Sequence, residues 1–184
     1  FGFAGRLLTN KGIRALVAAH LALRQQGHDW RLLIAGSPDP ANPASVSTED
    51  VEAWRNAPGV TLLGQIQDIA ELWRRSHIAV LPSHREGLPV SLLEAAACGR
   101  PLISTDAPGC REIAIHEQTG LSVPIEDATA LAQAMAQLAQ SRELRAQYGQ
   151  AARELVEDKL SAKIIGLSVV ALYDRLASAS GTRR

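Results

Sequence analysis

Short, continuous apolar runs alternate with amphipathic segments along the first two thirds of the chain. The apolar runs predict strands at residues 1–5, 30–35, 60–63, 78–81, 101–104 and 120–124. Between them, apolar positions are spaced for one face of a helix, as in the stretch from Lys11 to Gln26. Strands that are apolar throughout and are separated by helices are typical of a parallel sheet covered on both faces. The pattern therefore predicts an α/β fold.

Turn and capping residues set the limits of these elements. Gly27 ends the first helix. Residues 39–47 are rich in Pro, Asn, Ser and Asp, which indicates a loop, and a short helix is expected over residues 48–56. Asp68 begins another helix, and because Glu71 stands three residues later we expect a reciprocal capping box there.

The chain after Asp127 is expected to be helical, over residues 128–140, 143–157 and 162–177, with a frayed polar tail at 178–184. The last of these helices is apolar on more than one side. We therefore expect it to pack either against another domain of the same protein or against a second copy of the chain.

Ligands of open parallel sheets bind beyond the carboxyl ends of the strands. The loops expected at that edge are residues 5–11, 36–38, 64–67, 83–88 and 105–109. Candidate chemistry is therefore sought in these five loops.

The loop at 83–88 leads into a helix with an unusual start. Gly87 permits a tight turn after Glu86, and Pro89 suits a first helical turn, where its missing N–H costs nothing. The amides of Val90 and Ser91 would then be free at the positive end of the helix dipole. Free amides at a helix start form an anion site.

Glu94 is the only charged residue between Gly87 and the helix end at Gly99. Helical spacing places it on the same face as Val90 and Ser91, and side chains on a helix lean back toward its N-terminus. Its carboxylate would meet a neutral donor beside the anion, such as a sugar hydroxyl. The alternatives are a pair with a core arginine or a plain position on the helix surface.

Composition narrows the class of protein. The 184 residues include 19 basic and 19 acidic side chains, so the net charge of zero argues against a general nucleic-acid binder. The apolar content of 46% is ordinary for a globular core. No apolar run approaches the roughly 18 residues of a membrane-spanning helix. Cys98 and Cys110 have no metal-ligand spacing and are expected to be reduced thiols of a cytoplasmic protein.

Several cofactor classes lack their motifs in this chain. No G-x-G-x-x-G follows the first strand, and no G-x-x-x-x-G-K-[ST] occurs, which argues against a dinucleotide enzyme and a P-loop ATPase. The five histidines show no metal-ligand spacing, so no metal site is expected.

Two cations, Arg6 and Lys11, flank the loop after the first strand. Together with the amides of Val90 and Ser91 they would suit a diphosphate, because two phosphates need several donors and these are available without a metal. The alternative is a pair of solvated surface charges.

Motifs on these loops resemble a known family, the retaining glycosyltransferases of family 4 (group 1), which have the GT-B fold. The matching motifs, in chain order, are Gly5-Arg6-Leu7, Lys11-Gly12, Gly64-Gln65-Ile66, Glu86-Gly87-Leu88-Pro89, Glu94-Ala95 and Gly99-Arg100-Pro101. The resemblance covers residues 1–177. It implies the C-terminal, Rossmann-like, donor-binding domain, which is one half of a GT-B fold, with extra C-terminal helices and without the N-terminal acceptor domain.

The resemblance assigns roles by matching position. It implies that Arg6 and Lys11 hold the donor diphosphate and stabilise the leaving group, and that Glu86 contacts hydroxyls of the transferred sugar. Glu94 would accept hydrogen bonds from the ribose hydroxyls. Backbone groups supply the remaining contacts to sugar, phosphate and base, from Gly5, Ile66, Gln67, Gly87, Leu88, Pro89, Val90 and Ser91.

The implied activity is transfer of a hexose from a nucleotide diphosphate sugar, most simply a UDP- or GDP-sugar, to an acceptor hydroxyl with retained configuration and no cofactor. The acceptor would be a glycan or a lipid-linked sugar in polysaccharide biosynthesis. Because the chain lacks an initial Met and opens within a strand, we expect a fragment that is inactive alone. The whole protein would be cytoplasmic, with peripheral contact to the inner membrane face through the other domain. The alternatives are a non-catalytic binding module, and another nucleotide-sugar enzyme of the same fold such as an epimerase or hydrolase.

Overall fold

Six parallel strands form one sheet in the computed structural model, which describes residues 1–180. The strands are β1 (Gly2–Ala4), β2 (Leu32–Ala35), β3 (Val60–Gly64), β4 (Ala79–Leu81), β5 (Leu102–Thr105) and β6 (Gly120–Val123). Their order across the sheet is β3-β2-β1-β4-β5-β6, and every pair is parallel. The order reverses between β1 and β4, so the chain leaves these two neighbours in opposite directions and a crevice opens at their carboxyl ends.

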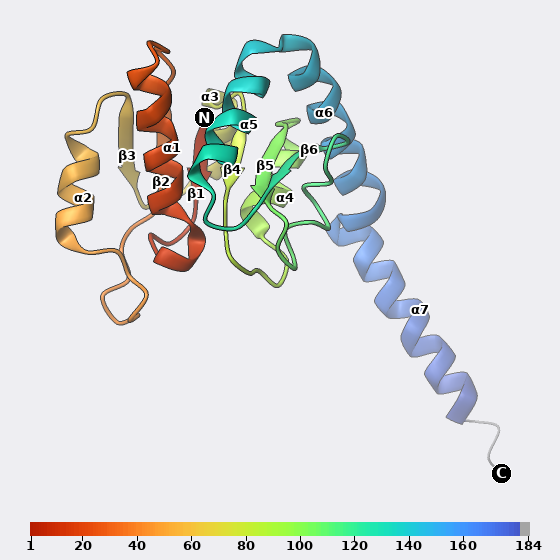
Figure 1. Cartoon of the computed structure of the whole chain (residues 1–184). Coiled ribbons are helices and arrows are strands. Elements are labelled where there is room, and N and C mark those ends of the chain that lie inside the picture. The colour runs from red at the N-terminus through yellow and green to blue at the C-terminus, as the bar shows by residue number, and fades with distance from the viewer. Residues whose placement is uncertain (181–184) are drawn as a thin grey trace.

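Helices cover both faces of the sheet (Figure 1). The first face carries α1 (Ile13–Gln25) and α5 (Ala128–Gln140), which pack against each other. The second face carries α3 (Ile69–Arg75) and α4 (Val90–Ala97), while α2 (Thr48–Arg55) lies beside β3 and α6 (Arg142–Leu155) packs on α4. The predicted α/β fold with helices on both faces is confirmed.

The core explains why the strands are apolar throughout. β1, β2, β4 and β5 are buried along their whole length, since each is covered on both faces by helices. Phe3, Ile34 and Ile103 are fully buried on three of these strands. β3 lies at the sheet edge and is only half-buried. The three tryptophans serve in packing, because Trp54 and Trp73 are buried and Trp30 packs edge-on against Phe1.

The C-terminal helices differ in detail from the prediction. The helix predicted to end at residue 157 passes into a π-helical turn, η2 (Val156–Leu160), and α7 (Ala162–Ser180) follows. Residues 178–180 of the predicted frayed tail belong to α7, and the rest of that tail lies outside the described residues. Close backbone approach fixes α6 on the end of α4, because a Cβ on Gly149 would lie 2.3 Å from the Gly99 carbonyl oxygen.

α7 extends away from the body of the molecule (Figure 1). Its main contact is with η2, and seven of its large apolar side chains are exposed, namely Ile165, Leu167, Val169, Val170, Leu172, Tyr173 and Leu176. The expectation that another domain or a second copy covers this helix stays a prediction. Within the described residues, none of the helices is both long and apolar enough to span a bilayer.

One expected cap turns out differently. The Asp68 side chain accepts a bond from the Glu71 amide, but Glu71 binds Arg74 instead of completing the box. The reciprocal capping box occurs at Ser47 and Asp50, at the start of α2. The predicted loop at residues 5–11 contains a 3₁₀ turn, η1 (Thr9–Lys11).

Candidate functional site

A lysine and a glutamate meet at the crevice between β1 and β4. The Lys11 Nζ donates to both carboxylate oxygens of Glu86, at 2.6 and 2.7 Å. The two side chains are 21% and 11% exposed, so the pair is largely shielded while one edge stays open to solvent. Two functional candidates from loops 75 residues apart in sequence are therefore in direct contact.

Lys11 owes its place to the glycine that follows it. Gly12 has φ of +69°, where a side chain is strained, and it caps α1. A Cβ at this position would lie 1.9 Å from the Pro82 carbonyl oxygen. The Lys11-Gly12 sequence thus brings the start of α1 against the loop after β4, at a distance that only glycine allows.

Glu86 is held from the other side by the loop after β5. Its amide donates to the Pro108 carbonyl at 3.0 Å, and Gly109, with φ of +83°, packs so closely that a Cβ would lie 2.4 Å from the Glu86 carbonyl oxygen. The chain bends at Gly87, as expected of a turn there, but its φ lies outside the left-handed region and a Cβ would meet open space. The tight approach therefore belongs to Gly109, and Gly87 leaves room above the backbone.

The start of α4 opens beside this pair. Pro89 is the N-cap, one position before its expected place in the first turn, and no side chain caps the helix. Leu92 and Leu93 both donate to the Pro89 carbonyl, whereas the amides of Val90 and Ser91 have no acceptor within residues 1–180. These amides were expected to be free, and they are. The exposed Leu88 and Val90 side chains flank the opening.

Glu94 lies one turn further along α4 and is half-buried. Burial raises the pKa of its carboxyl above the usual value, because the charged form loses solvation. No hydrogen-bond partner for this carboxylate occurs among residues 1–180, so the pair with a core arginine is not formed. A half-buried carboxylate without a partner has its acceptor capacity available for a ligand.

A cavity of about 440 Å³ lies at the carboxyl ends of β1, β2 and β3. Gly5, Gln65 and Ile66 line it, whereas the candidate Gln67 is exposed and is not among its lining residues. Arg6 also lines this cavity, and its guanidinium binds the Asp39 carboxylate at 2.9 Å. The structure places Arg6 at the carboxyl edge, but in contact with Asp39 and not with the Lys11–Glu86 pair.

Neighbouring charged residues form local pairs. The His84 imidazole lies 3.6 Å from the Glu126 carboxylate, and Asp106 pairs with Arg111 at 3.3 Å. Cys110 is fully buried near the site. Burial, and to a smaller extent the nearby Glu86 carboxylate, raises the pKa of its thiol.

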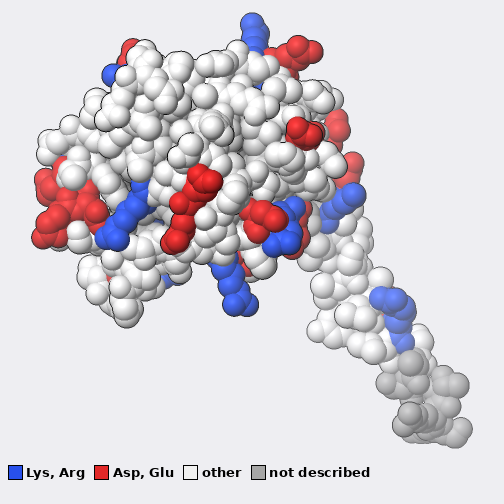
Figure 2. All heavy atoms as spheres, in the orientation of Figure 1, with Lys and Arg blue, Asp and Glu red and all other residues white. Residues whose placement is uncertain are grey.

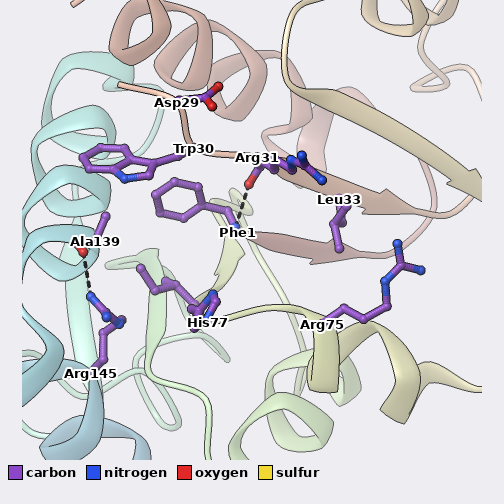
Figure 3. A pocket seen from close by; sticks show the side chains of 10 residues that line it. Phe1, Asp29, Trp30, Arg31, Leu33, Arg75, His77, Ala139 and Arg145 are labelled. Atoms are coloured by element: carbon purple, nitrogen blue, oxygen red, sulfur yellow. Dashed lines mark hydrogen bonds between the residues drawn. The ribbon is translucent and has the colours of Figure 1, made fainter. Parts of the chain in front are cut away.

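Another cavity, of about 400 Å³, lies at the opposite edge of the sheet (Figure 3). Phe1, Trp30 and His77 line it together with several arginines. The Arg145 guanidinium donates to the Leu138 and Ala139 carbonyls and so caps the C-terminal end of α5. Sequence reasoning assigned no function to this edge.

On the face seen in Figure 2, Lys and Arg side chains stand apart from one another, whereas Asp and Glu side chains gather at the left, over α2. Among the described residues, no three His, Cys, Asp or Glu side chains are grouped so that they could hold a metal ion.

Three residues that shape the site were missed in the sequence. Gly109 supports Glu86, and two buried hydroxyls, Ser83 and Thr105, donate to backbone carbonyls around it. Polar residues at the ends of apolar strands are the signal that could have found the hydroxyls, because a buried hydroxyl needs a partner.

Comparison with known proteins agrees with this architecture. Residues 1–141 match the family described as glycosyl transferases group 1. The chain is 32% identical over 173 residues to N,N'-diacetylbacillosaminyl-diphospho-undecaprenol alpha-1,3-N-acetylgalactosaminyltransferase of Campylobacter jejuni, with 93% of this chain and 43% of that protein covered. The chain thus spans less than half of the length of this relative.

Two solved structures superpose closely. Sucrose-phosphate synthase of Thermosynechococcus elongatus gives a TM-score of 0.84 at 31% identity, covering 97% of this chain and 45% of that one. Anabaena Alr3699/HepE in complex with UDP also gives a TM-score of 0.84, at 19% identity, covering 95% of this chain and 48% of that one. The second likeness concerns the fold alone.

Proposed function

This chain belongs to the group 1 glycosyl transferases, and from that premise we propose that its carboxyl sheet edge binds the nucleotide diphosphate sugar donor of a retaining glycosyl transfer. The observation that carries the proposal is the Lys11–Glu86 pair beside the unbonded amides of Val90 and Ser91. A cation, a helix start and a carboxylate are the groups that a sugar diphosphate requires side by side.

The diphosphate is proposed to bind between Lys11 and the start of α4. A lysine ammonium has three hydrogen-bond donors, and Glu86 uses two of them, so one remains for a phosphate oxygen. The Val90 and Ser91 amides and the helix dipole add to this attraction. Arg6 would leave Asp39 or reach past it to the second phosphate, which its 61% exposed side chain permits.

The sugar and the nucleoside are proposed to lie on either side of the diphosphate. Glu86 would accept hydrogen bonds from the transferred sugar, for which the open space above Gly87 leaves room. Glu94 would accept hydrogen bonds from the ribose hydroxyls. These bonds would replace the solvation that its carboxylate loses on burial. The base would enter the 440 Å³ cavity beside Gly5 and Ile66.

Catalysis in this proposal is electrostatic. The bond from the anomeric carbon to the diphosphate oxygen breaks, and negative charge develops on the leaving diphosphate, where Lys11, Arg6 and the α4 amides stabilise it. The acceptor oxygen bonds to the anomeric carbon on the face that the diphosphate leaves. The acceptor proton passes to a phosphate oxygen, so no protein base or covalent intermediate is required.

The acceptor, the donor base and the cellular location stay predictions. The Campylobacter relative is named for transfer to a diphospho-undecaprenol sugar, and we propose by analogy a glycan or lipid-linked acceptor on the cytoplasmic side of the membrane. A further domain of the protein is proposed to bind it.

Product analysis with the full-length protein tests the proposal. With a nucleotide sugar and an acceptor, we expect a glycoside whose anomeric configuration, read by NMR, equals that of the donor. Inverted configuration would contradict the retaining mechanism, and free sugar as the only product would favour a hydrolase. Absence of any donor binding would favour a non-catalytic module.

A further inference from the structure

Three buried hydroxyls lie at the carboxyl ends of β4 and β5. Ser83, Ser104 and Thr105 are 0%, 0% and 1% exposed. Each donates to a backbone carbonyl on another segment of the chain, so all three link neighbouring segments. None of them was assigned a role by the motifs.

Two of the hydroxyls form consecutive links through Ser83, and we call this pair of links the relay. The Thr105 hydroxyl, at the end of β5, donates to the Ser83 carbonyl in the loop after β4. The Ser83 hydroxyl donates in turn to the Asn10 carbonyl at 3.1 Å, with the Arg85 carbonyl at 3.3 Å as a second acceptor. The His84 amide also donates to Asn10, at 2.9 Å, which strengthens the same junction.

The relay ends where the functional pair begins. Asn10 directly precedes Lys11, and Ser83 lies three residues before Glu86. The relay therefore joins the two backbone segments that carry the ammonium and the carboxylate. Gly12 brings the Lys11 segment against Pro82, and Gly109 packs the loop after β5 against the Glu86 backbone.

We propose that Ser83 and Thr105 are positioning residues that hold the Lys11 ammonium against the Glu86 carboxylate. This inference rests on the proposed function, in which Lys11 binds the diphosphate and Glu86 binds the sugar. The spacing of these two groups sets where the anomeric carbon lies relative to its leaving group. Lysine has a long, flexible side chain, so that spacing requires the backbone at both ends to be fixed.

Ser104 provides a matched control. Its hydroxyl is equally buried and donates to the Leu81 carbonyl at 2.6 Å, but that bond lies within the sheet, between β5 and β4. Loss of the Ser104 hydroxyl removes a buried hydrogen bond of the same kind from within the sheet. A purely structural role for Thr105 would make the two variants behave alike.

The first measurement is NMR of the 184-residue chain labelled at the lysine ε-carbons. The chain has three lysines, so three signals are expected, and Lys11→Arg identifies that of Lys11. The position of the Lys11 signal in Glu86→Gln is the reference for a weakened Lys11–Glu86 pair. Thr105→Val, which keeps the shape and loses the donor, is expected to move the Lys11 signal toward that reference. Thr105→Ser, which keeps the donor, and Ser104→Ala are expected to leave it in place.

The second measurement is kinetic and uses the full-length protein. Because small misplacement of reacting groups costs up to about 100-fold in rate, we expect Thr105→Val to lower kcat by about 10–100-fold. KM for the nucleotide sugar should change much less, since the base cavity is untouched. Thr105→Ser is expected to restore most of kcat, and Ser104→Ala to keep it.

Equal behaviour of Thr105→Val and Ser104→Ala, in both the Lys11 signal and kcat, would overturn the inference. A wild-type protein that transfers no sugar would instead contradict the proposed function. In that case the lysine signals would still decide whether the relay holds Lys11 against Glu86.

Discussion

The two edges of the sheet carry cavities of similar size, about 440 Å³ at the carboxyl ends of the strands and about 400 Å³ at the opposite ends. At the carboxyl edge, loops from several strands converge, glycines allow backbones to touch, and a shielded ion pair lies beside unbonded helix amides. At the other edge, the cavity is bounded by large aromatic and arginine side chains, one of which serves to end a helix. Cavity volume therefore does not distinguish the two edges, but convergence of fixed backbone groups does.

The topology explains this difference. Reversal of the strand order between β1 and β4 separates the loops that follow these strands, and the crevice exists only at their carboxyl ends. Long side chains on a surface lose conformational entropy when a ligand orders them, whereas backbone amides and a fixed ion pair are already in place. We expect substitutions at the carboxyl edge to change function and those at the opposite edge to leave it unchanged.

The largest effect is expected for Lys11→Ala. Loss of the ammonium removes the main charge that stabilises the leaving diphosphate, so transfer should fall by about 1000-fold or more. Rates of the full-length protein measure this effect, and far-UV circular dichroism checks the fold. Lys163→Ala, on the exposed α7, is the matched control and should keep its rate. Near-normal transfer by Lys11→Ala would remove Lys11 from the site.

Gly12→Ala should destabilise the fold more than the same substitution at a glycine that has positive φ but lies in open space. Gly27 is such a glycine, with φ of +91° and nothing within 4 Å of a Cβ. Gly27→Ala carries the conformational strain alone, about 1–2 kcal/mol. Gly12→Ala must in addition push away the Pro82 carbonyl, so we expect about 3–5 kcal/mol. Urea unfolding measures both free energies, and equal losses would show that the close approach is not needed.

Glu94→Gln should weaken nucleotide binding by about 10-fold or more, because a charged acceptor for the ribose hydroxyls becomes neutral. Burial raises the pKa of Glu94 above its usual 4.5, so the wild-type carboxylate becomes protonated at a higher pH than an exposed glutamate. Nucleotide affinity of the wild type should therefore decline as the pH falls through that raised pKa. Calorimetric titration across acidic pH measures the decline, which should be smaller in Glu94→Gln.

The same substitution should have the opposite effect on stability without nucleotide. A carboxyl whose pKa is raised by folding contributes stability that is present below its usual pKa and is lost as pH rises through the raised value. Glu94→Gln avoids that loss. The variant should therefore unfold at a higher temperature than the wild type at neutral pH, and the difference should shrink toward about pH 4. A destabilised variant at neutral pH would indicate that Glu94 has a partner.

The smallest effect is expected at the opposite edge. Arg31→Ala and Arg75→Ala remove two arginines that line the cavity of Figure 3 without a place in the proposed site. Because neither touches the loops at the carboxyl edge, each should change the transfer rate by less than about twofold. A large loss of activity in either variant would extend the functional surface to both edges of the sheet.

Much of the fold was predictable because the strands are short, continuous apolar runs and each is bounded by turn residues. The positions of Lys11, Glu86 and the α4 start at one edge follow from parallel topology alone. Their direct contact does not, because the distance between loops after β1 and β4 depends on packing at Gly12 and Gly109. The pattern also did not reveal the close approach of Gly109 to Glu86, since glycine in a sequence does not show whether its φ is positive.

The Arg6 contact with Asp39 shows a second limit of the sequence. Asp39 falls in a loop of irregular composition, and its partner lies 33 residues earlier, so no periodicity connects them. The relay through Ser83 and Thr105 was hidden for the same reason. Interactions between loops are set by three-dimensional closure, whereas the pattern of apolar positions reports local structure.

The donor site at the carboxyl edge is tested most directly by titrating the 184-residue chain with UDP, GDP and ADP and following the amide NMR shifts. At least one nucleotide is expected to shift the amides of Gly5, Ile66, Val90 and Ser91, and Glu94→Ala is expected to weaken the response. Residues at the opposite edge, such as His77, should not respond. Shifts confined to the opposite edge, or an unchanged response in Glu94→Ala, would contradict the assignment of the donor site to the carboxyl edge.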